Sequence, residues 1–142
     1  MRVVLDTSLM IAALRSPNGA AAEILRHVLA SRITLLMDSK LACEYEAVAL
    51  RPQHLHATGR SRTETVALLD TLYDLAEAVL VSYRYRPLSP DSDDDMLLEL
   101  AINGQANAAV SFNTKHFSEP LRAFGIEAYR PAEFLKRLSR RK

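Results

Sequence analysis

The segment AAAEILRHVLASRITLLMD, residues 20–38, places a helical pattern directly before a strand pattern. Four apolar residues recur at helical spacing within residues 20–32, whereas residues 33–37 form an apolar, partly β-branched run. A second short apolar run, residues 3–5, lies upstream and ends at Asp6. Strand, helix and strand in this order predict parallel neighbours, because parallel strands need a crossover connection.

The rest of the chain repeats this alternation, which predicts one domain over residues 1–142. Ser61 and Glu64 have the spacing of a helix capping box, and Pro52 marks an expected helix end. Expected helices cover residues 39–51, 61–75, 92–104 and 131–138, and further strands cover residues 77–82, 108–112 and 126–129. The predicted fold class is α/β, with a mostly parallel central sheet of about five strands flanked by helices on both faces.

Composition narrows the class of protein. A chain of 142 residues is long enough for one core but too short for two of comparable size. With 49% hydrophobic and 25% charged residues it matches average globular proteins, which argues against disordered, collagen-like and membrane-spanning classes. No signal peptide is evident, and a single cysteine, Cys43, excludes an internal disulfide and a cysteine-based zinc site. We expect a cytoplasmic protein.

Acidic and basic residues are segregated although the net charge is only +1. Four aspartates fall within residues 91–95, and residues 136–142 form a basic C-terminal tail. The tail is either a solvated chain end or a contact for a polyanion, and both interpretations stay open.

The sequence lacks several common catalytic arrangements. Its four glycines are far apart, so there is neither a dinucleotide fingerprint nor a phosphate-binding P-loop. No serine has the glycine-flanked setting of a Ser-His-Asp hydrolase, and the four histidines lack the HExxH spacing. The candidate chemistry therefore rests on carboxylates.

Two polar residues directly follow expected strands. Asp6 follows residues 3–5, and Asn113 follows residues 108–112. In an open α/β sheet the ligand crevice lies beyond these carboxyl ends. Oxygen atoms here are candidate metal ligands, although both residue types also commonly begin turns.

Glu44 is a third candidate because of its position on the helix expected over residues 39–51. Leu41, Tyr45 and Val48 define the inward side, and Glu44 lies within that stripe. Glu46 is rotated about 200° from Glu44 and is free to face water. An inward carboxylate is costly unless it is paired or binds a metal, so a buried ion pair is the alternative.

The aspartate cluster is the fourth candidate. One or two acids suffice to stabilise a helix N-terminus, whereas four within five positions repel one another unless a hard divalent cation binds. Asp94 shares the helical stripe of Leu97, Leu98 and Ala101, which favours it as the inner ligand. Asp95 is the second choice as inner ligand, and Asp91 and Asp93 are expected to cap the helix or to lie outside the inner set of metal ligands.

Taken in order, these motifs resemble those of the PIN-domain family over essentially the whole chain. They are Leu5-Asp6-Thr7-Ser8, Cys43-Glu44-Tyr45-Glu46, the aspartate cluster followed by Met96-Leu97-Leu98-Glu99-Leu100-Ala101, and Val110-Ser111-Phe112-Asn113 with Lys115-His116-Phe117. Within the family the chain is most similar to the small bacterial and archaeal toxins of toxin–antitoxin pairs, the VapC-type ribonucleases.

The resemblance implies a Mg²⁺- or Mn²⁺-dependent endoribonuclease with an acidic site at Asp6, Glu44, Asp94 and Asn113. Asp95 stays an alternative to Asp94, because the cluster fits the family pattern in two registers. The fourth position is often aspartate in the family, so Asn113 departs from the pattern by supplying no charge.

The same resemblance implies partners. The substrate is RNA, with Ser8, Lys115 and Arg130 as candidate contacts. A cognate antitoxin protein and a homodimer are also expected, and no membrane is involved.

Two other classes compete with this interpretation. A receiver-like phosphoacceptor domain is also α/β, with acids near strand ends, but it needs an aspartate after its third strand. A catalytically impaired PIN-like module that binds nucleic acid or protein is favoured by the neutral Asn113.

Overall fold

A five-stranded sheet forms the centre of the computed structural model, which describes residues 1–81 and 92–140 without the side chains of residues 92–94 and 116. The strand order is β3-β2-β1-β4-β5, and every neighbouring pair is parallel. The strands are β1 (Arg2–Leu5), β2 (Thr34–Met37), β3 (Glu77–Ala78), β4 (Ala108–Val110) and β5 (Glu127–Tyr129). The predicted fold class is confirmed.

The central strand β1 is buried on both faces, as parallel strands covered by helices are. Val3, Val4 and Leu5 are fully buried, and Val3 pairs with Leu35 of β2 and Ala108 of β4. The strand order also differs from the 2-1-3-4-5 order of flavodoxin-like receiver domains. The receiver-like alternative is therefore wrong.

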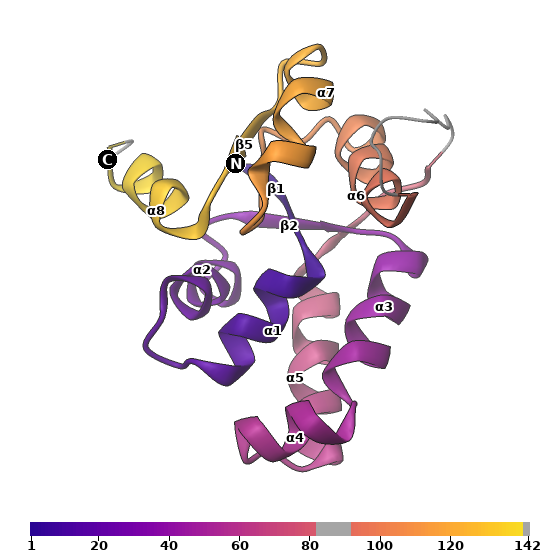
Figure 1. Ribbon diagram of the computed structural model, residues 1–142, viewed down its shortest axis with the longest axis vertical. Helices are drawn as coiled ribbons and strands as arrows, with labels where there is room; N and C mark the ends of the chain where they lie inside the picture. Colours follow the sequence, from indigo (N-terminus) through magenta and orange to yellow (C-terminus); the bar gives the residue numbers. More distant parts are fainter. Residues whose placement is uncertain (82–91, 141–142) are drawn as a thin grey trace.

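Helices cover both faces of the sheet, as predicted (Figure 1). On one side lie α1 (Thr7–Arg15), α2 (Ala20–Leu29), α3 (Ser39–Ala49), α4 (Pro52–Thr58) and α5 (Arg62–Leu75). On the other lie α6 (Ser92–Asn103) and α7 (Ser118–Arg122), which follows the short 3₁₀ helix η1 (Thr114–His116). The last helix, α8 (Pro131–Arg140), contacts α2 and β5. In the described part of the chain no helix is long and apolar enough to span a membrane.

Helices α1 and α4 were not expected from the sequence. Residues 7–15 are buried at six positions, so α1 lacks the wide polar face that would reveal helical periodicity. Helix α3 ends before Pro52, as expected, and Pro52 itself occupies the first turn of α4, where its missing N–H loses no helical hydrogen bond. The two helices contact each other, and both border the surface next to the candidate site.

Other boundaries also differ from expectation. Strand β3 ends at Ala78, whereas residues 77–82 were expected, and residue 82 lies outside the described residues. Helix α8 extends to Arg140, so residues 136–140 of the expected basic tail are helical rather than a frayed chain end. The predicted capping box is confirmed, because Ser61 and Glu64 exchange hydrogen bonds of 3.2 and 3.1 Å.

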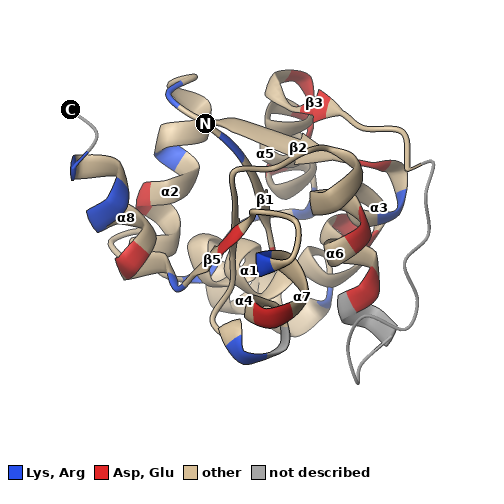
Figure 2. Cartoon of the chain, turned by 90° about the horizontal axis from the view of Figure 1, so that it is seen from above, with Lys and Arg blue, Asp and Glu red and all other residues tan. Residues whose placement is uncertain are grey.

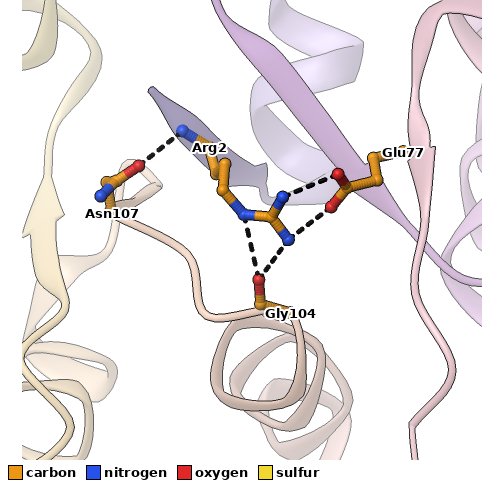
Figure 3. Close-up of polar contacts among 4 residues, drawn as sticks. All are labelled: Arg2, Glu77, Gly104 and Asn107. Carbon is orange, nitrogen blue, oxygen red and sulfur yellow. Dashed lines mark hydrogen bonds and ion pairs between the residues drawn. The ribbon is translucent and has the colours of Figure 1, made fainter.

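A polar cluster fastens the amino edge of the sheet (Figure 3). The Arg2 guanidinium donates to Glu77 of β3 at 2.7 Å and to the Gly104 carbonyl at 2.6 and 3.2 Å. The Arg2 backbone N–H donates to Asn107 Oδ1 at 2.7 Å. Gly104 directly follows α6, so β1 is joined here to β3 and to the end of α6, on the edge opposite to Asp6.

Candidate active site

Asp6 lies where β1 ends and α1 begins, and it is held there from two directions. Its backbone N–H donates to the Val110 carbonyl of β4 at 3.1 Å. Its half-buried carboxylate accepts through Oδ2 from Ser8 Oγ at 3.1 Å and from Ser111 Oγ at 2.8 Å. The carboxylate is thus oriented at the carboxyl edge of the sheet, where the sequence placed it.

Ser111 joins Asp6 to Asn113. It follows β4, is 2% exposed, and accepts the Asn113 backbone N–H at 3.1 Å while donating to Asp6. Asn113 is exposed and directly precedes η1. The two residues predicted at adjacent strand ends are therefore connected through one buried hydroxyl. Sequence reasoning missed Ser111, although its position directly after an apolar strand was a usable signal.

Glu44 reaches the same region from α3. Its side chain is half-buried, and Oε2 accepts from Thr7 Oγ1 at 2.7 Å. Thr7 is the first residue of α1 and directly follows Asp6, so Glu44 is anchored next to Asp6 in the chain. The predicted inward orientation of Glu44 is confirmed, and Glu46 is exposed as expected.

Tyr45 fixes α3 against the end of β1. The side chain is fully buried, and its hydroxyl donates to the Leu5 carbonyl. Burial raises the pKa of Tyr45 well above its usual value, and nearby negative groups, Asp6 foremost, raise it further. The phenol therefore stays neutral and keeps donating, which holds Glu44 and Asp6 in a constant relation.

Helix α6 contributes the aspartate cluster, of which the structure describes one side chain. Asp95 is 3% exposed, and Leu97, Leu98 and Ala101 of the predicted stripe are buried. The side chain of Asp94, like that of Asp93, lies outside the described residues, as does Asp91 altogether. Asp95 thus points into the protein, and the choice between Asp94 and Asp95 as metal ligand stays a prediction.

Glu99 is a further buried carboxylate that sequence reasoning missed. It is 3% exposed and lies one helical turn after Asp95, a spacing that places both on one face of α6. Glu99 lines a pocket of about 200 Å³ together with Asp38 and Lys40. Asp38 caps α3 by accepting the Leu41 N–H at 2.8 Å, which gives this acid a structural role.

The three predicted substrate contacts lie at the carboxyl edge of the sheet. Ser8 is exposed and touches Asp6, and Lys115 is exposed in η1. Arg130 is exposed directly after β5, where the Ser111 N–H donates to the Tyr129 carbonyl at 3.0 Å. Figure 2 shows further basic positions on α2 and α8.

The donor set fits a hard divalent cation. Asp6 and Glu44 accept only hydroxyl hydrogen bonds and form no ion pair with another described residue. Magnesium is typically held by one or two carboxylates, with water and substrate phosphate completing its coordination. Among the described side chains, which exclude Asp93 and Asp94, no three acidic, His or Cys groups lie close enough to hold a metal.

Comparisons with known proteins agree with this fold. A family model described as PIN domain matches residues 2–115. Among solved structures, the chain is similar to one in the crystal structure of VapBC2 from Rickettsia felis bound to a DNA fragment from their promoter, with 17% identity and a TM-score of 0.61. The match covers 92% of this chain and 98% of that one, which shows a shared fold. No curated protein matched.

Proposed function

Because the chain belongs to the PIN-domain family, whose members are nucleases, we propose that it is a metal-dependent endoribonuclease and the toxin of a toxin–antitoxin pair acting in the cytoplasm. The observation that carries the proposal is the anchoring of both Asp6 and Glu44 at the start of α1, Asp6 by Ser8 and Ser111 and Glu44 by Thr7. Both carboxylates are oriented by hydroxyl donors and neither has a basic partner among the described residues.

In this proposal Asp6 and Glu44 hold Mg²⁺ or Mn²⁺, together with Asp94 or Asp95 from α6. When bound, such an ion activates a water molecule and stabilises the negative charge of phosphodiester hydrolysis. Ser111 fixes the orientation of the Asp6 carboxylate. No covalent protein intermediate is required.

RNA phosphates would approach from the exposed carboxyl edge of the sheet. Ser8, Lys115 and Arg130 are exposed there and supply a hydroxyl and two cations. Basic residues of α8 offer a second contact surface (Figure 2). Cationic groups of this kind give binding that weakens with salt, because they replace counterions on the phosphates.

An antitoxin partner and a homodimer are part of the same proposal. The similar solved structure is a VapBC2 assembly bound to promoter DNA, which supports a partner protein for this chain. Co-expression with the product of a short neighbouring gene should abolish cleavage and co-purify the two proteins. Failure of both would remove that gene product as the antitoxin.

A catalytically impaired binding module is the second candidate, and the neutral, exposed Asn113 favours it. Mn²⁺ titration calorimetry and an RNA cleavage assay with and without metal separate the two functions. The wild type should bind Mn²⁺ and cleave, whereas Asp6→Asn and Glu44→Gln should lose both.

Glu46→Gln is the matched control, since Glu46 is exposed on the same helix. It should behave as the wild type. Metal-independent cleavage, or equal cleavage by the wild type and Asp6→Asn, would refute the nuclease proposal.

A further inference from the structure

An open groove runs away from the carboxylate site along α1. Its volume is about 600 Å³, and it lies between α1, α4 and the segment after β4. Ser8 lines it at the end nearest the site, where its hydroxyl also touches Asp6. Arg15 lines the groove seven residues further along α1, about 10 Å away at 1.5 Å per residue.

Phe112 supplies an aromatic surface to this groove. It is 42% exposed although phenylalanine is usually buried, and it stands between Ser111 and Asn113 of the candidate site. The hydrogen bond from the Asn113 N–H to Ser111 Oγ spans Phe112 and holds its backbone. The ring is thus presented beside the carboxylates by a fastened segment.

Arg15 supplies a cation at the other end. It is exposed in the last turn of α1 and forms no ion pair with a described residue. An exposed aromatic ring and an unpaired guanidinium along one groove match the alternation of bases and phosphates in a single strand.

Resting on the proposed function, we propose that this groove binds single-stranded RNA next to the cleaved bond, with a base stacked on Phe112 and a phosphate at Arg15. Continuity with the site through Ser8 favours RNA as the occupant. A protein helix is a poorer fit, because such a partner buries a continuous apolar face in a hydrophobic groove. The aliphatic lining here is small, since Ala12 and Ala57 carry only methyl groups and Ile11 is 8% exposed.

The first test measures the affinity for a short fluorescein-labelled single-stranded RNA of mixed sequence by anisotropy, in a Glu44→Gln background that keeps the RNA intact. Phe112→Ala should weaken binding about 5- to 150-fold, the range for removing one base-stacking aromatic. Phe112→Tyr should retain affinity, and Phe112→Leu should not. Phe124→Ala is the matched control, because Phe124 is 44% exposed but lies between α7 and β5.

A readout specific to stacking comes from the RNA. An abasic site at the stacked position should weaken binding of the Phe112-containing protein but cause no further loss in Phe112→Ala, since coupled partners are not additive. The logarithm of the RNA binding constant falls linearly with the logarithm of the salt concentration, and we call the steepness of this line the salt slope. Arg15→Gln should lower the salt slope by about 0.7, the value of one single-strand phosphate contact. Arg122→Gln, in a different pocket beside Gly125, should leave the slope unchanged.

The outcomes separate this proposal from the nuclease proposal. Unchanged RNA affinity in Phe112→Ala, with the fold intact by circular dichroism, overturns base stacking even if the wild type cleaves RNA with metal. A changed oligomeric state with unchanged RNA affinity also overturns it and assigns the groove to self-association. A wild type that neither binds nor cleaves RNA refutes both proposals.

Discussion

Replacing Ser111 by alanine removes one oxygen atom, Oγ, that hydrogen-bonds both Asp6 and Asn113, and should therefore destabilise the protein at the candidate site. The Ser111 hydroxyl donates to Asp6 Oδ2 at 2.8 Å and accepts the Asn113 N–H at 3.1 Å, and the side chain is 2% exposed. A hydrogen bond to an ionised group stabilises a protein by about 1.5–3 kcal/mol. Water can replace the acceptor for the exposed Asn113, so we expect a total loss of about 2–3 kcal/mol in the free energy of unfolding.

Ser8→Ala is the matched control for this prediction. Ser8 donates to the same oxygen at 3.1 Å, but it is exposed, so water takes its place. Ser8→Ala should lower the free energy of unfolding by less than about 0.5 kcal/mol. Urea denaturation followed by circular dichroism measures both variants, provided that the m-values agree.

A double-mutant cycle with Asp6→Ala isolates the pair. In the Asp6→Ala background, Ser111→Ala should lower the free energy of unfolding by about 1–2 kcal/mol less than it does in the wild type, because the carboxylate that Ser111 supports is gone. Mn²⁺ affinity should also fall about 10- to 100-fold in Ser111→Ala, as when a hydrogen-bond partner of a metal ligand is removed. Additive stability losses together with unchanged Mn²⁺ affinity would show that Ser111 does not orient Asp6.

Three further predictions concern other parts of the chain. Gly104→Ala should lower the free energy of unfolding by about 1–3 kcal/mol, because its Cβ would lie 2.8 Å from Leu36 Cδ1; unchanged urea stability would contradict this packing. Burial, with nearby Glu46, raises the pKa of Tyr73 to about 12, whereas the pKa of tyrosine in the unfolded chain is about 10. The neutral phenol therefore contributes to the free energy of unfolding below about pH 10, and this contribution is lost as the pH rises from about 10 towards 12. Urea titrations at alkaline pH should accordingly show a shallower stability loss in Tyr73→Phe than in the wild type, and equal slopes would argue against it. The third change neutralises three basic residues of α8 together, Lys136, Arg137 and Arg140. The salt slope of RNA binding should fall by about 0.7 for each true phosphate contact, while the Mn²⁺ affinity stays the same. An unchanged slope would show that these residues have no role in binding RNA.

The sheet and two of the candidate carboxylates were predictable because local signals report them directly. Short apolar runs ending at Asp6 and before Asn113 marked the strands, and helical phase separated the inward Glu44 from the exposed Glu46. These signals depend only on neighbours within a few residues. The same is true of the capping box at Ser61.

What escaped prediction depends on contacts between distant segments. Thr7 and Ser111 are ordinary residues in sequence, and only the folded arrangement makes them donors to Glu44 and Asp6. Helical phase placed Asp95 to one side of the apolar stripe of Leu97, Leu98 and Ala101, yet its side chain is buried. This burial likewise follows from how α6 packs on β1 and α3. The groove beside Phe112 is bounded by α1 and α4, the two helices that left no clear pattern.

The placement of β1 at the middle of the sheet sets when this protein can acquire its structure during synthesis. The strand made first pairs with β2, but its other neighbour, β4, begins only at Ala108. The Arg2 contacts span 75 to 105 residues, and the Asp6–Ser111 bond spans 105. Contacts over such separations form late, because the intervening chain must first be ordered. A ribosome-bound chain that stops short of residue 113 therefore lacks the complete site, so the site should form only after β4 and the segment that follows it have been made.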